Sequence, residues 1–239
     1  MNIALFGYGK MGQAIERIAV MRGHHIALKI NAESRTGMDA KSFAGCDVVI
    51  EFTHPEAAAE NVTLCLEAGI PVISGTTGWN EELPAVTALC ERLHGALLVA
   101  SNFSIGVNLF FALNRQLARL MQPHTEYRIQ VEETHHTHKK DAPSGTAISL
   151  AQDIIAENTA YTGWQLGNDA AEGNIPIEAH RKEGVPGTHS ITYSSGIDDI
   201  CIEHTAHSRE GFAMGAVLAA EFIAGKRGVF TMKDVLASA

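Results

Sequence analysis

Three glycines close to the amino terminus, Gly7, Gly9 and Gly12, constrain the fold of this chain more than any other feature. They follow a short apolar run at 2–6 and precede a segment of helical periodicity and a second apolar run at 25–30. A strand, a glycine turn, a helix and a second strand within roughly 30 residues form the unit that binds dinucleotides. The first glycine permits the tight turn, the second lets the backbone approach a pyrophosphate, and the third lets the helix pack on the strand. The sequence therefore predicts a Rossmann-type domain at the amino terminus.

The residue that ends the second apolar run bears on which dinucleotide is used. An Asp or Glu is usual there, where it binds the ribose hydroxyls, but this chain has Asn31. Asn can also hydrogen-bond a ribose, yet it does not repel a 2′-phosphate, with which Lys29 or Arg35 could pair. The sequence favours NADPH, or the use of both cofactors, over strict use of NADH.

Strands and helices are expected to alternate up to residue 104. The expected strands are 47–52, 71–74 and 96–100, and the expected helices between them are 56–67 and 80–93. Ligands of open α/β sheets bind at the carboxyl ends of the strands. The loop Gly75-Thr76-Thr77-Gly78 ends one such strand and offers backbone donors and hydroxyls to a nicotinamide or ribose. An ordinary turn is the alternative reading of that loop taken alone.

After an expected helix at 105–121 the pattern changes to alternating strands. The strands expected there are 128–132, 178–181, 189–194 and 199–204, with a helix at 146–157, a mobile loop at 158–174 and a final helix at 212–224. The predicted fold class is α/β: a Rossmann-type parallel sheet with helices on both faces, plus a smaller α+β domain for substrate binding and oligomerisation. The expected domains are 1–104, completed by a C-terminal helix at 212–239, and 105–211.

Composition limits the partners and the compartment. A net charge of −9 argues against nucleic acid as a partner. There is no apolar stretch of transmembrane length, and the chain enters a strand at once, without the charged region of a signal peptide. The four cysteines lack metal or redox spacing and are expected to be reduced thiols in the core of a cytoplasmic protein. They are Cys46, Cys65, Cys90 and Cys201.

A run of histidines and lysines at 135–140 is the strongest indication of chemistry. Three His and two Lys in six positions are costly to bury, and the run leads into Ser144-Gly145-Thr146, which is typical of a helix start that can hold an anion. A proton donor beside such a site indicates an enzyme acting on a small carboxylate. A solvated surface loop and a zinc site at His135, His136 and His138 are the alternatives. No metal site is predicted, because no Cys lies nearby and the lysines would repel a cation.

Together these motifs resemble the short form of the 4-hydroxy-tetrahydrodipicolinate reductase family, also called dihydrodipicolinate reductases, of bacterial lysine and diaminopimelate synthesis. The segments that carry the resemblance span nearly the whole chain: GYGKMG (7–12), EFTHPEA (51–57), GTTGW (75–79), SNFSIGVN (101–108), HHTHKKDAPSGTA (135–147) and SREGFAMGAV (208–217). The resemblance implies that NADPH or NADH reduces a cyclic imine dicarboxylate, dihydrodipicolinate formed from 4-hydroxy-tetrahydrodipicolinate, to tetrahydrodipicolinate. It also implies a homotetramer built through the sheet of the second domain.

The resemblance further implies roles for individual residues. His135 matches the general acid, for which an imidazole titrating near neutrality is suited, and Lys139 matches a second proton donor or carboxylate-binding residue. The substrate-binding positions are His136, Ser144, Gly145 and Thr146. The cofactor-binding positions are Gly7, Gly9, Lys10, Met11, Gly12, Asn31, Gly75, Thr76, Thr77, Ala100, Ser101, Asn102 and Phe103. Asn31 departs from the acid that many members carry.

Other readings stay open. A reductase of a different small acid, such as an amino-acid dehydrogenase, would share only the first domain, and a non-catalytic dinucleotide sensor would need no proton donor. Asp141 is expected to orient its loop or neutralise Lys140, and His138 and His180 are expected to be structural. Arg209 either pairs with substrate or caps a turn. Domain closure is expected about hinges near 101–107 and 208–212.

Overall fold

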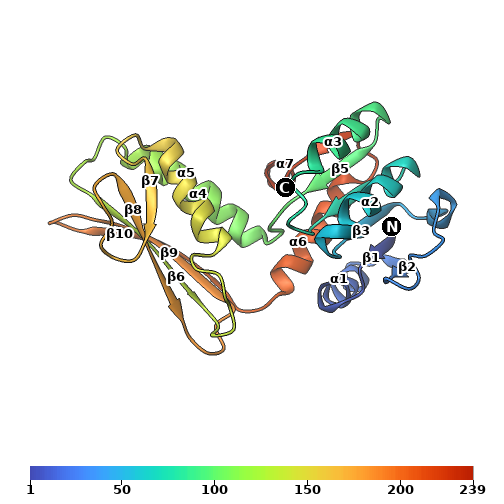
Figure 1. Ribbon diagram of the computed structural model, residues 1–239, viewed down its shortest axis with the longest axis horizontal. Helices are drawn as coiled ribbons and strands as arrows, with labels where there is room; N and C mark the ends of the chain where they lie inside the picture. The colour runs from blue at the N-terminus through green and yellow to red at the C-terminus, as the bar shows by residue number, and fades with distance from the viewer. Residues whose placement is uncertain (239) are drawn as a thin grey trace. The chain divides into compact units, whose positions relative to one another are not determined.

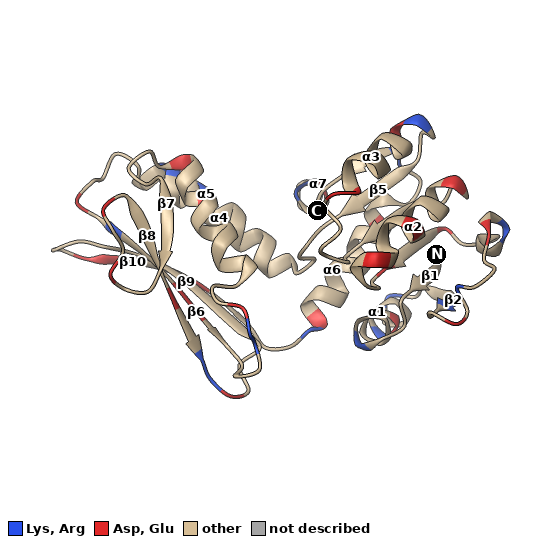
Figure 2. Ribbon diagram, viewed as in Figure 1, with Lys and Arg blue, Asp and Glu red and all other residues tan. Residues whose placement is uncertain are grey.

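The computed structural model describes residues 1–238, and the chain divides into two compact units. The first unit comprises Met1–Asn108 together with the segment that begins at Arg209, and the second is Leu109–Ser208. Figure 1 identifies their helices and strands. Figure 2 shows positive and negative residues interspersed in both units. Within residues 1–238, no helix is long and apolar enough to cross a membrane.

The first unit is built on a six-stranded sheet whose strands are all parallel, in the order β11-β5-β4-β3-β1-β2. Most residues of its inner strands are apolar and buried, as expected when helices cover both faces of a parallel sheet. The strands are β1 (Asn2–Phe6), β2 (His25–Ile30), β3 (Val48–Glu51), β4 (Val72–Ser74), β5 (Ala96–Val99) and β11 (Gly228–Phe230).

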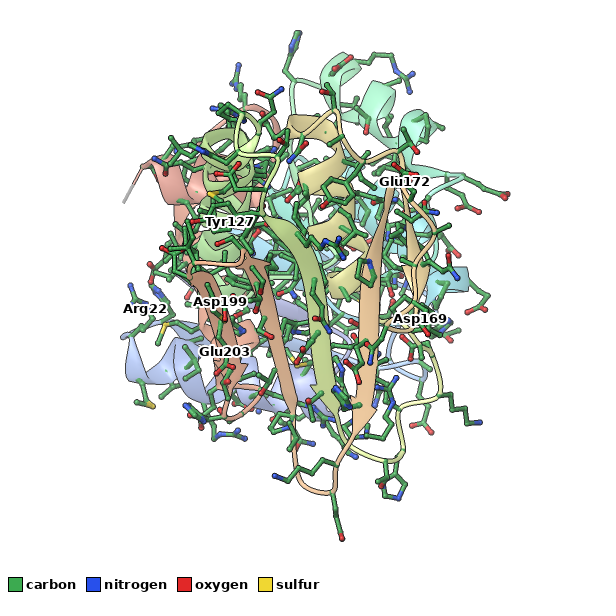
Figure 3. All side chains as sticks on the ribbon, turned by 90° about the vertical axis from the view of Figure 1, so that its left-hand side faces the viewer. Arg22, Tyr127, Asp169, Glu172, Asp199 and Glu203 are labelled. Carbon is green, nitrogen blue, oxygen red and sulfur yellow. The ribbon has the colours of Figure 1, made fainter. Side chains whose placement is uncertain are left out.

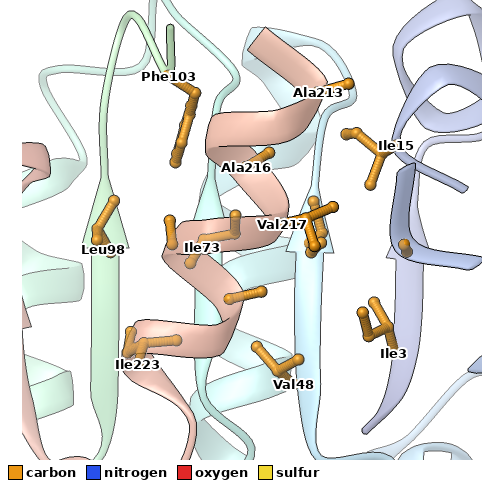
Figure 4. Close-up of a cluster of buried hydrophobic side chains, with 14 of the residues drawn as sticks. Ile3, Ile15, Val48, Ile73, Leu98, Phe103, Ala213, Ala216, Val217 and Ile223 are labelled. Atoms are coloured by element: carbon orange, nitrogen blue, oxygen red, sulfur yellow. The ribbon is translucent and has the colours of Figure 1, made fainter. Parts of the chain in front are cut away.

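Helices pack on both faces of this sheet through two separate apolar clusters. One face carries α1 (Lys10–Met21), α6 (Glu210–Ile223) and α7 (Met232–Ala237), and the other carries α2 (Pro55–Glu67), α3 (Leu83–Arg92) and the short 3-10 helix η1 (Ala40–Phe43). Figure 4 shows α6 lying over the strands, and its Ala216 and Val217 belong to the same apolar cluster as Ile73. The small side chains of α6 allow close contact with the sheet. The predicted Rossmann-type fold is confirmed.

The carboxyl-terminal segment differs from the prediction of one helix over 212–239. Helix α6 ends at Ile223, and β11 then pairs with β5 at the edge of the sheet before α7 begins. A three-residue strand is too short to show a period in the sequence. The segment completes the first unit with both a helix and an edge strand.

The second unit contains a five-stranded mixed sheet in the order β10-β9-β6-β8-β7. Strands β6 and β8 are parallel, whereas β9 runs antiparallel to both of its neighbours. Helices α4 and α5 pack on one face through an apolar cluster that includes Leu150, Ile177 and Tyr193. The elements are α4 (Ile105–Met121), β6 (Arg128–His135), α5 (Gly145–Glu157), β7 (Gly163–Leu166), β8 (Asn174–Arg181), β9 (Gly187–Ser194) and β10 (Asp199–Ala206).

The opposite face of this mixed sheet presents polar side chains, because successive residues of a strand point to opposite faces. Asp199 and Glu203 on β10, both labelled in Figure 3, belong to that face. Cys201 lies between them and is exposed, so the prediction that all four cysteines are core thiols is wrong for this one. The other three are buried, and all four are free.

The segment 158–174 was expected to be a loop, but it contains β7 (Gly163–Leu166), which pairs in parallel with β8. Tyr161 and Trp164 are partly buried against the core of the second unit. The strand has four residues among polar and glycine neighbours, so its pattern in the sequence is weak. Tertiary packing of the two aromatic side chains fixes this segment.

Candidate active site

The glycine turn between β1 and α1 is required by close contacts. Gly7 has a φ of +92°, and a Cβ atom there would lie 1.9 Å from the backbone oxygen of Phe52. A Cβ at Gly12 would lie 2.4 Å from the backbone oxygen of Gly7. Gly9 is the N-cap of α1, and the space where its Cβ would be is open. The turn therefore leaves room above the helix start, where unpaired backbone N–H groups favour an anion.

A pocket of about 490 Å³ lies at the carboxyl ends of the strands of the first unit. The predicted cofactor positions that line it are Gly9, Lys10, Met11, Gly12, Gly75, Thr76 and Thr77. Three further residues that line the pocket were not predicted from the sequence: Phe52, Thr53 and Pro55. The predicted positions Gly7, Asn31, Ala100, Ser101, Asn102 and Phe103 lie outside this lining. Phe103 is buried in the core, with its ring centroid 5.6 Å from that of Phe52.

A buried carboxylate organises the loops around this pocket. Glu51, at the end of β3, accepts hydrogen bonds from the hydroxyls of Ser74 at 2.5 Å and Thr76 at 2.9 Å. It also accepts bonds from the backbone N–H of Thr53 at 3.1 Å and from the Thr53 hydroxyl. The motif EFTHPEA contains this acid, but its role depends on partners from the next strand, which the sequence analysis did not pair with it.

The end of β2, where the adenosine ribose is expected, is held by local bonds. Asn31 accepts a hydrogen bond from the backbone N–H of Ser34 at 2.8 Å through its side-chain oxygen. The two cations considered as partners for a 2′-phosphate are both in ion pairs. Lys29 pairs with Glu16 at 2.7 Å, and Arg35 pairs with Glu60 at 2.7 Å. A 2′-phosphate would have to compete with these carboxylates.

A cluster of buried polar side chains forms on the mixed sheet of the second unit. His135 is the last residue of β6, and Glu133 lies two residues earlier on the same face. His189 on β9 is the cross-strand partner of Glu133, and Arg181 on β8 is the partner of His135. One Glu133 oxygen lies 3.6 Å from Nδ1 of His135 and 3.6 Å from Nε2 of His189. Glu133, His189 and Arg181 were not among the site residues predicted from the sequence.

Arg181 attaches the loop that follows β6 to the sheet. Its guanidinium donates to the backbone oxygens of Lys139 at 3.3 Å and Asp141 at 2.6 Å, and it lies 3.4 Å from a Glu133 oxygen. The Asp141 carboxylate pairs with Lys139 at 2.7 Å, rather than with the expected Lys140, and this bond lowers the pKa of Asp141. Lys139 is thus held beside the cluster with its charge partly compensated.

Helix α5 begins at this cluster. Ser144 is its N-cap, and the Ser144 hydroxyl accepts a hydrogen bond from the backbone N–H of Ala147 at 3.2 Å. The same hydroxyl lies 3.1 Å from Nε2 of His189, so it is already engaged within the protein. Gly145 is exposed with open space beside it, and Thr146 is half-buried. The first backbone N–H groups of α5 are the donors best placed to hold an anion here.

The electrostatics of the cluster follow from its burial. Burial alone would raise the pKa of Glu133, but His189 and the hydroxyl and amide of Ser144 overcome that effect and lower it to about 2. Burial, followed by the neighbouring His189, lowers the pKa of His135 to about 4, although Glu133 acts in the opposite direction. The expectation of an imidazole titrating near neutrality is therefore wrong for the ligand-free protein. His135 is neutral at pH 7 in that state.

Ligand atoms of Glu133, His135 and His189 lie within 4.8 Å of one another, a spacing that a metal ion could bridge. Arg181 already pairs with the carboxylate, and Lys139 adds a second cation. This balance favours an anion over a metal cation, and we assign no metal to the cluster.

Three other histidines of interest, and Arg209, make contacts outside the buried cluster. The ring centroids of His136 and His138 are 6.2 Å apart, and the buried Nδ1 of His136 has no hydrogen-bond partner within residues 1–238. His180 lies 3.4 Å from Glu178. Arg209 is the N-cap residue of α6, and its backbone oxygen accepts a bond from Phe212.

A Rossmann-type unit with a glycine-turn pocket, together with a mixed-sheet unit, defines a class of two-domain oxidoreductases. Two solved structures illustrate the fold. A dipicolinate-bound dihydrodipicolinate reductase from Paenisporosarcina sp. TG-14 matches with a TM-score of 0.78 and 22% identity, covering 98% of both chains. An amine dehydrogenase from Mycobacterium smegmatis matches with a TM-score of 0.61 and 11% identity, over 98% of this chain and 95% of that one.

Sequence comparison gives the family. Models described as dihydrodipicolinate reductase, N-terminus, and dihydrodipicolinate reductase, C-terminus, match residues 1–103 and 106–236. The 4-hydroxy-tetrahydrodipicolinate reductase of Christiangramia forsetii is 52% identical over 236 residues, covering 99% of this chain and 98% of that protein. A reductase of the same name from an Anaeromyxobacter species is 34% identical, over 99% and 97% of the two chains. The chain belongs to the dihydrodipicolinate reductase family, which confirms the resemblance found in the sequence.

Proposed function

We propose that this protein reduces dihydrodipicolinate, the cyclic imine dicarboxylate formed from 4-hydroxy-tetrahydrodipicolinate, to tetrahydrodipicolinate with NADH or NADPH. The reaction belongs to lysine and diaminopimelate synthesis. The observation that carries the proposal is the cluster at the start of α5, where His135, Lys139 and Arg181 meet the free N–H groups of a helix. The cationic side chains and the N–H groups are suited to binding a substrate with two carboxylates, and the imidazole is suited to giving it a proton.

The pocket of the first unit fits a dinucleotide. The open space at Gly9 and the free N–H groups of the first turn of α1 are suited to a pyrophosphate, and Thr76 and Thr77 offer hydroxyls and amides at the sheet edge. When bound, the reduced nicotinamide supplies a hydride. Asn31 can hydrogen-bond the ribose of either cofactor, and it lacks the carboxylate that would repel a 2′-phosphate. We therefore propose that the enzyme uses both NADH and NADPH.

The second unit binds and protonates the substrate. The backbone N–H groups of Gly145 and Thr146 hold one carboxylate, and Lys139 attracts the other. One hydride and one proton add across a double bond of the ring. In the substrate complex His135 acts as an imidazolium: it gives its proton to the ring carbon that gains electron density and becomes a neutral imidazole, which takes up a proton from solvent when the next substrate binds. The buried position of His135 keeps bulk water from competing for that carbon.

The reaction requires the cofactor held by the first unit and the substrate held by the second to meet, so we propose that the two units close over bound ligands. Hydrogen–deuterium exchange in segments 101–107 and 208–212 tests this. We expect slower exchange when both ligands are present. Equal exchange with and without ligands would reject closure about these hinges.

We also propose that the protein is a homotetramer joined through the polar face of the mixed sheet. That face contains Asp199, Cys201 and Glu203 on β10. Polar side chains suit a subunit interface whose surfaces must also remain soluble in the separated subunits. Light scattering after size-exclusion chromatography measures the mass directly. A single 25.6 kDa species at micromolar concentration would reject the tetramer.

A coupled assay tests the reaction itself. The substrate is made in place from pyruvate and aspartate semialdehyde by its synthase, and the loss of NADH and of NADPH absorbance is followed in parallel. We expect oxidation that depends on the synthase product. Binding of a cofactor without any oxidation would instead favour a dinucleotide sensor or a reductase of another acid.

A further inference from the structure

Glu133 carries a buried charge and takes no direct part in the steps of the proposed reaction. It is 1% exposed, in the central strand β6 of the mixed sheet. Both of its oxygens accept from the backbone N–H of Ser144, at 3.0 and 3.1 Å. The same carboxylate lies 3.4 Å from the Arg181 guanidinium and 3.6 Å from each of His135 and His189. Burying such a charge is costly, so its retention at the junction of four elements calls for a reason.

The ring of His135 is oriented toward this carboxylate. Its Nδ1 is buried and has no hydrogen-bond partner within residues 1–238, and one oxygen of Glu133 lies 3.6 Å away. At the other end of the ring, a Cβ added to Gly187 would lie 3.1 Å from Nε2, so the glycine gives that nitrogen its space. The His189 ring packs edge-on with its centroid 5.0 Å away. In this orientation the ring presents Nδ1 to the carboxylate.

The other titratable groups facing His135 oppose its protonation. They come from three places: His189 on β9, Arg181 on β8 and Lys139 in the loop after β6, and each adds to the effect of burial in lowering the pKa of His135. Glu133 is the group that raises it. A bound dicarboxylate would add negative charge on the loop side, so the carboxylate of Glu133 and the ligand would act on the ring together.

We propose that Glu133 is a positioning residue that faces Nδ1 of His135, stabilises the imidazolium form, and thereby makes dicarboxylate binding take up one proton from solvent at His135. The inference rests on the proposed function, because His135 is the proton donor there. The proton bound on ligand entry is the one transferred to the ring, after which the imidazole is again neutral. The bonds from Glu133 to Ser144 connect this proton site directly to the start of α5, where the carboxylate binds.

The first measurement uses dipicolinate as the probe, with the full-length protein and its oxidised cofactor. Isothermal titration calorimetry at pH 7 in phosphate and in Tris, buffers of different ionisation enthalpy, gives the number of protons taken up. We expect at least ~0.5 proton for the wild type. Nitrogen-15 spectra of labelled histidine, with the His135 signals identified by their loss in His135→Gln, should show an imidazolium only in the complex. Binding without uptake, no binding, or a neutral His135 in the complex would each overturn the proposal.

The second measurement removes the charge. Glu133→Gln keeps a side-chain oxygen for the Ser144 amide. We expect this variant to lose the proton uptake and to bind dipicolinate about tenfold more weakly. Glu133→Asp keeps the charge and should retain an imidazolium in the complex, which a purely structural role would not require. Glu132→Gln, one residue away on the opposite face of β6, is the matched control and should behave as the wild type.

The outcomes separate this inference from the proposed function. Unchanged proton uptake in Glu133→Gln, or equal loss in the Gln and Asp variants, would overturn the role of Glu133 even in an active reductase. Normal uptake with dipicolinate but no turnover of the imine would overturn the proposed reaction and support the proton site. If Glu133→Gln does not fold, the Asp variant and the wild-type spectra still decide the matter.

Discussion

Glu51 and Ser74 are register partners on the adjacent strands β3 and β4, and the Glu51 carboxylate accepts a hydrogen bond from the Ser74 hydroxyl at 2.5 Å. The same carboxylate joins Thr53 and Thr76, two residues that line the pocket. One buried charge therefore holds together two of the loops that end this parallel sheet.

Glu51→Gln should destabilise the protein by about 2–3 kcal/mol, because an amide group would face hydroxyl and amide donors that now point at a carboxylate. The pocket should loosen, and the dissociation constant of the nicotinamide cofactor should rise about tenfold. Urea denaturation and fluorescence titration measure the two effects. Glu60→Gln, an exposed acid on α2, is the control and should change stability by no more than ~1 kcal/mol. Wild-type stability and affinity in Glu51→Gln would contradict this role.

His135→Ala should lower turnover by roughly 10²–10⁴-fold with cofactor binding intact, because it removes the proposed proton donor. The coupled assay and a separate cofactor titration measure this. His138→Ala removes an exposed imidazole of the same loop and should stay close to the wild type. Unchanged turnover in His135→Ala would reject the assignment.

Lys139→Ala should raise the Michaelis constant about tenfold, the equivalent of ~1.4 kcal/mol, and should also lower the rate. The side chain of Lys139 is held at the cluster by Asp141, whereas Lys140 is exposed, so Lys140→Ala is the control. Steady-state kinetics with varied synthase product measures both constants. Unaltered constants in Lys139→Ala would show that the charge does not meet the substrate.

Asn31→Asp should shift cofactor preference toward NADH by about tenfold, because a carboxylate repels a 2′-phosphate. The new side chain can keep the hydrogen bond from Ser34, so the turn after β2 should persist. The ratio of kcat/KM for the two cofactors measures the change. An unaltered ratio would place the ribose away from Asn31.

The ion pair between Arg22 and Glu221 should make stability depend on pH. Arg22 contributes most to lowering the pKa of Glu221, with a further contribution from His24. A carboxylate with a lowered pKa adds stability above its unfolded pKa of about 4.3 and loses it as the pH falls through the folded value. Because both side chains are partly exposed, Glu221→Gln should cost only ~0.5–1 kcal/mol at pH 7.

Urea denaturation at pH 7 and pH 3.5 checks this dependence. The difference between wild type and Glu221→Gln should largely disappear at the lower pH, whereas Glu91→Gln, an exposed acid on α3, should show little difference at either pH. An equal cost at both pH values would show that the pair acts through packing rather than charge.

The fold was accessible from the sequence because its signals are local. The glycine turn, the apolar runs and the helical periods each lie within a few residues, and they predicted β1 to β5 and α1 to α6 closely. The short strands β7 and β11 were missed because three or four residues carry no clear period. Their places are set by the strands with which they pair.

The candidate site was only partly accessible. The histidine–lysine loop is contiguous, whereas its partners His189 and Arg181 arrive through strand pairing across the sheet. One signal was present: Ile129, Val131, Glu133 and His135 alternate along one face of β6, which places the acid and the histidine on the apolar side. The sequence alone gave no register for β8 and β9, so the cluster could not be assembled.

The position of α6 has a consequence for synthesis on the ribosome. Residues 109–208 form a unit that is continuous in the chain, whereas the sheet of the first unit receives α6 and β11 only after that unit has been made. Until then, one apolar face of β1, β3, β4 and β5 lacks its largest covering helix. We expect the unit 109–208 to fold before the first unit is complete. During that time the apolar sheet face of the amino-terminal segment stays partly exposed, and chaperones are expected to protect it from aggregation.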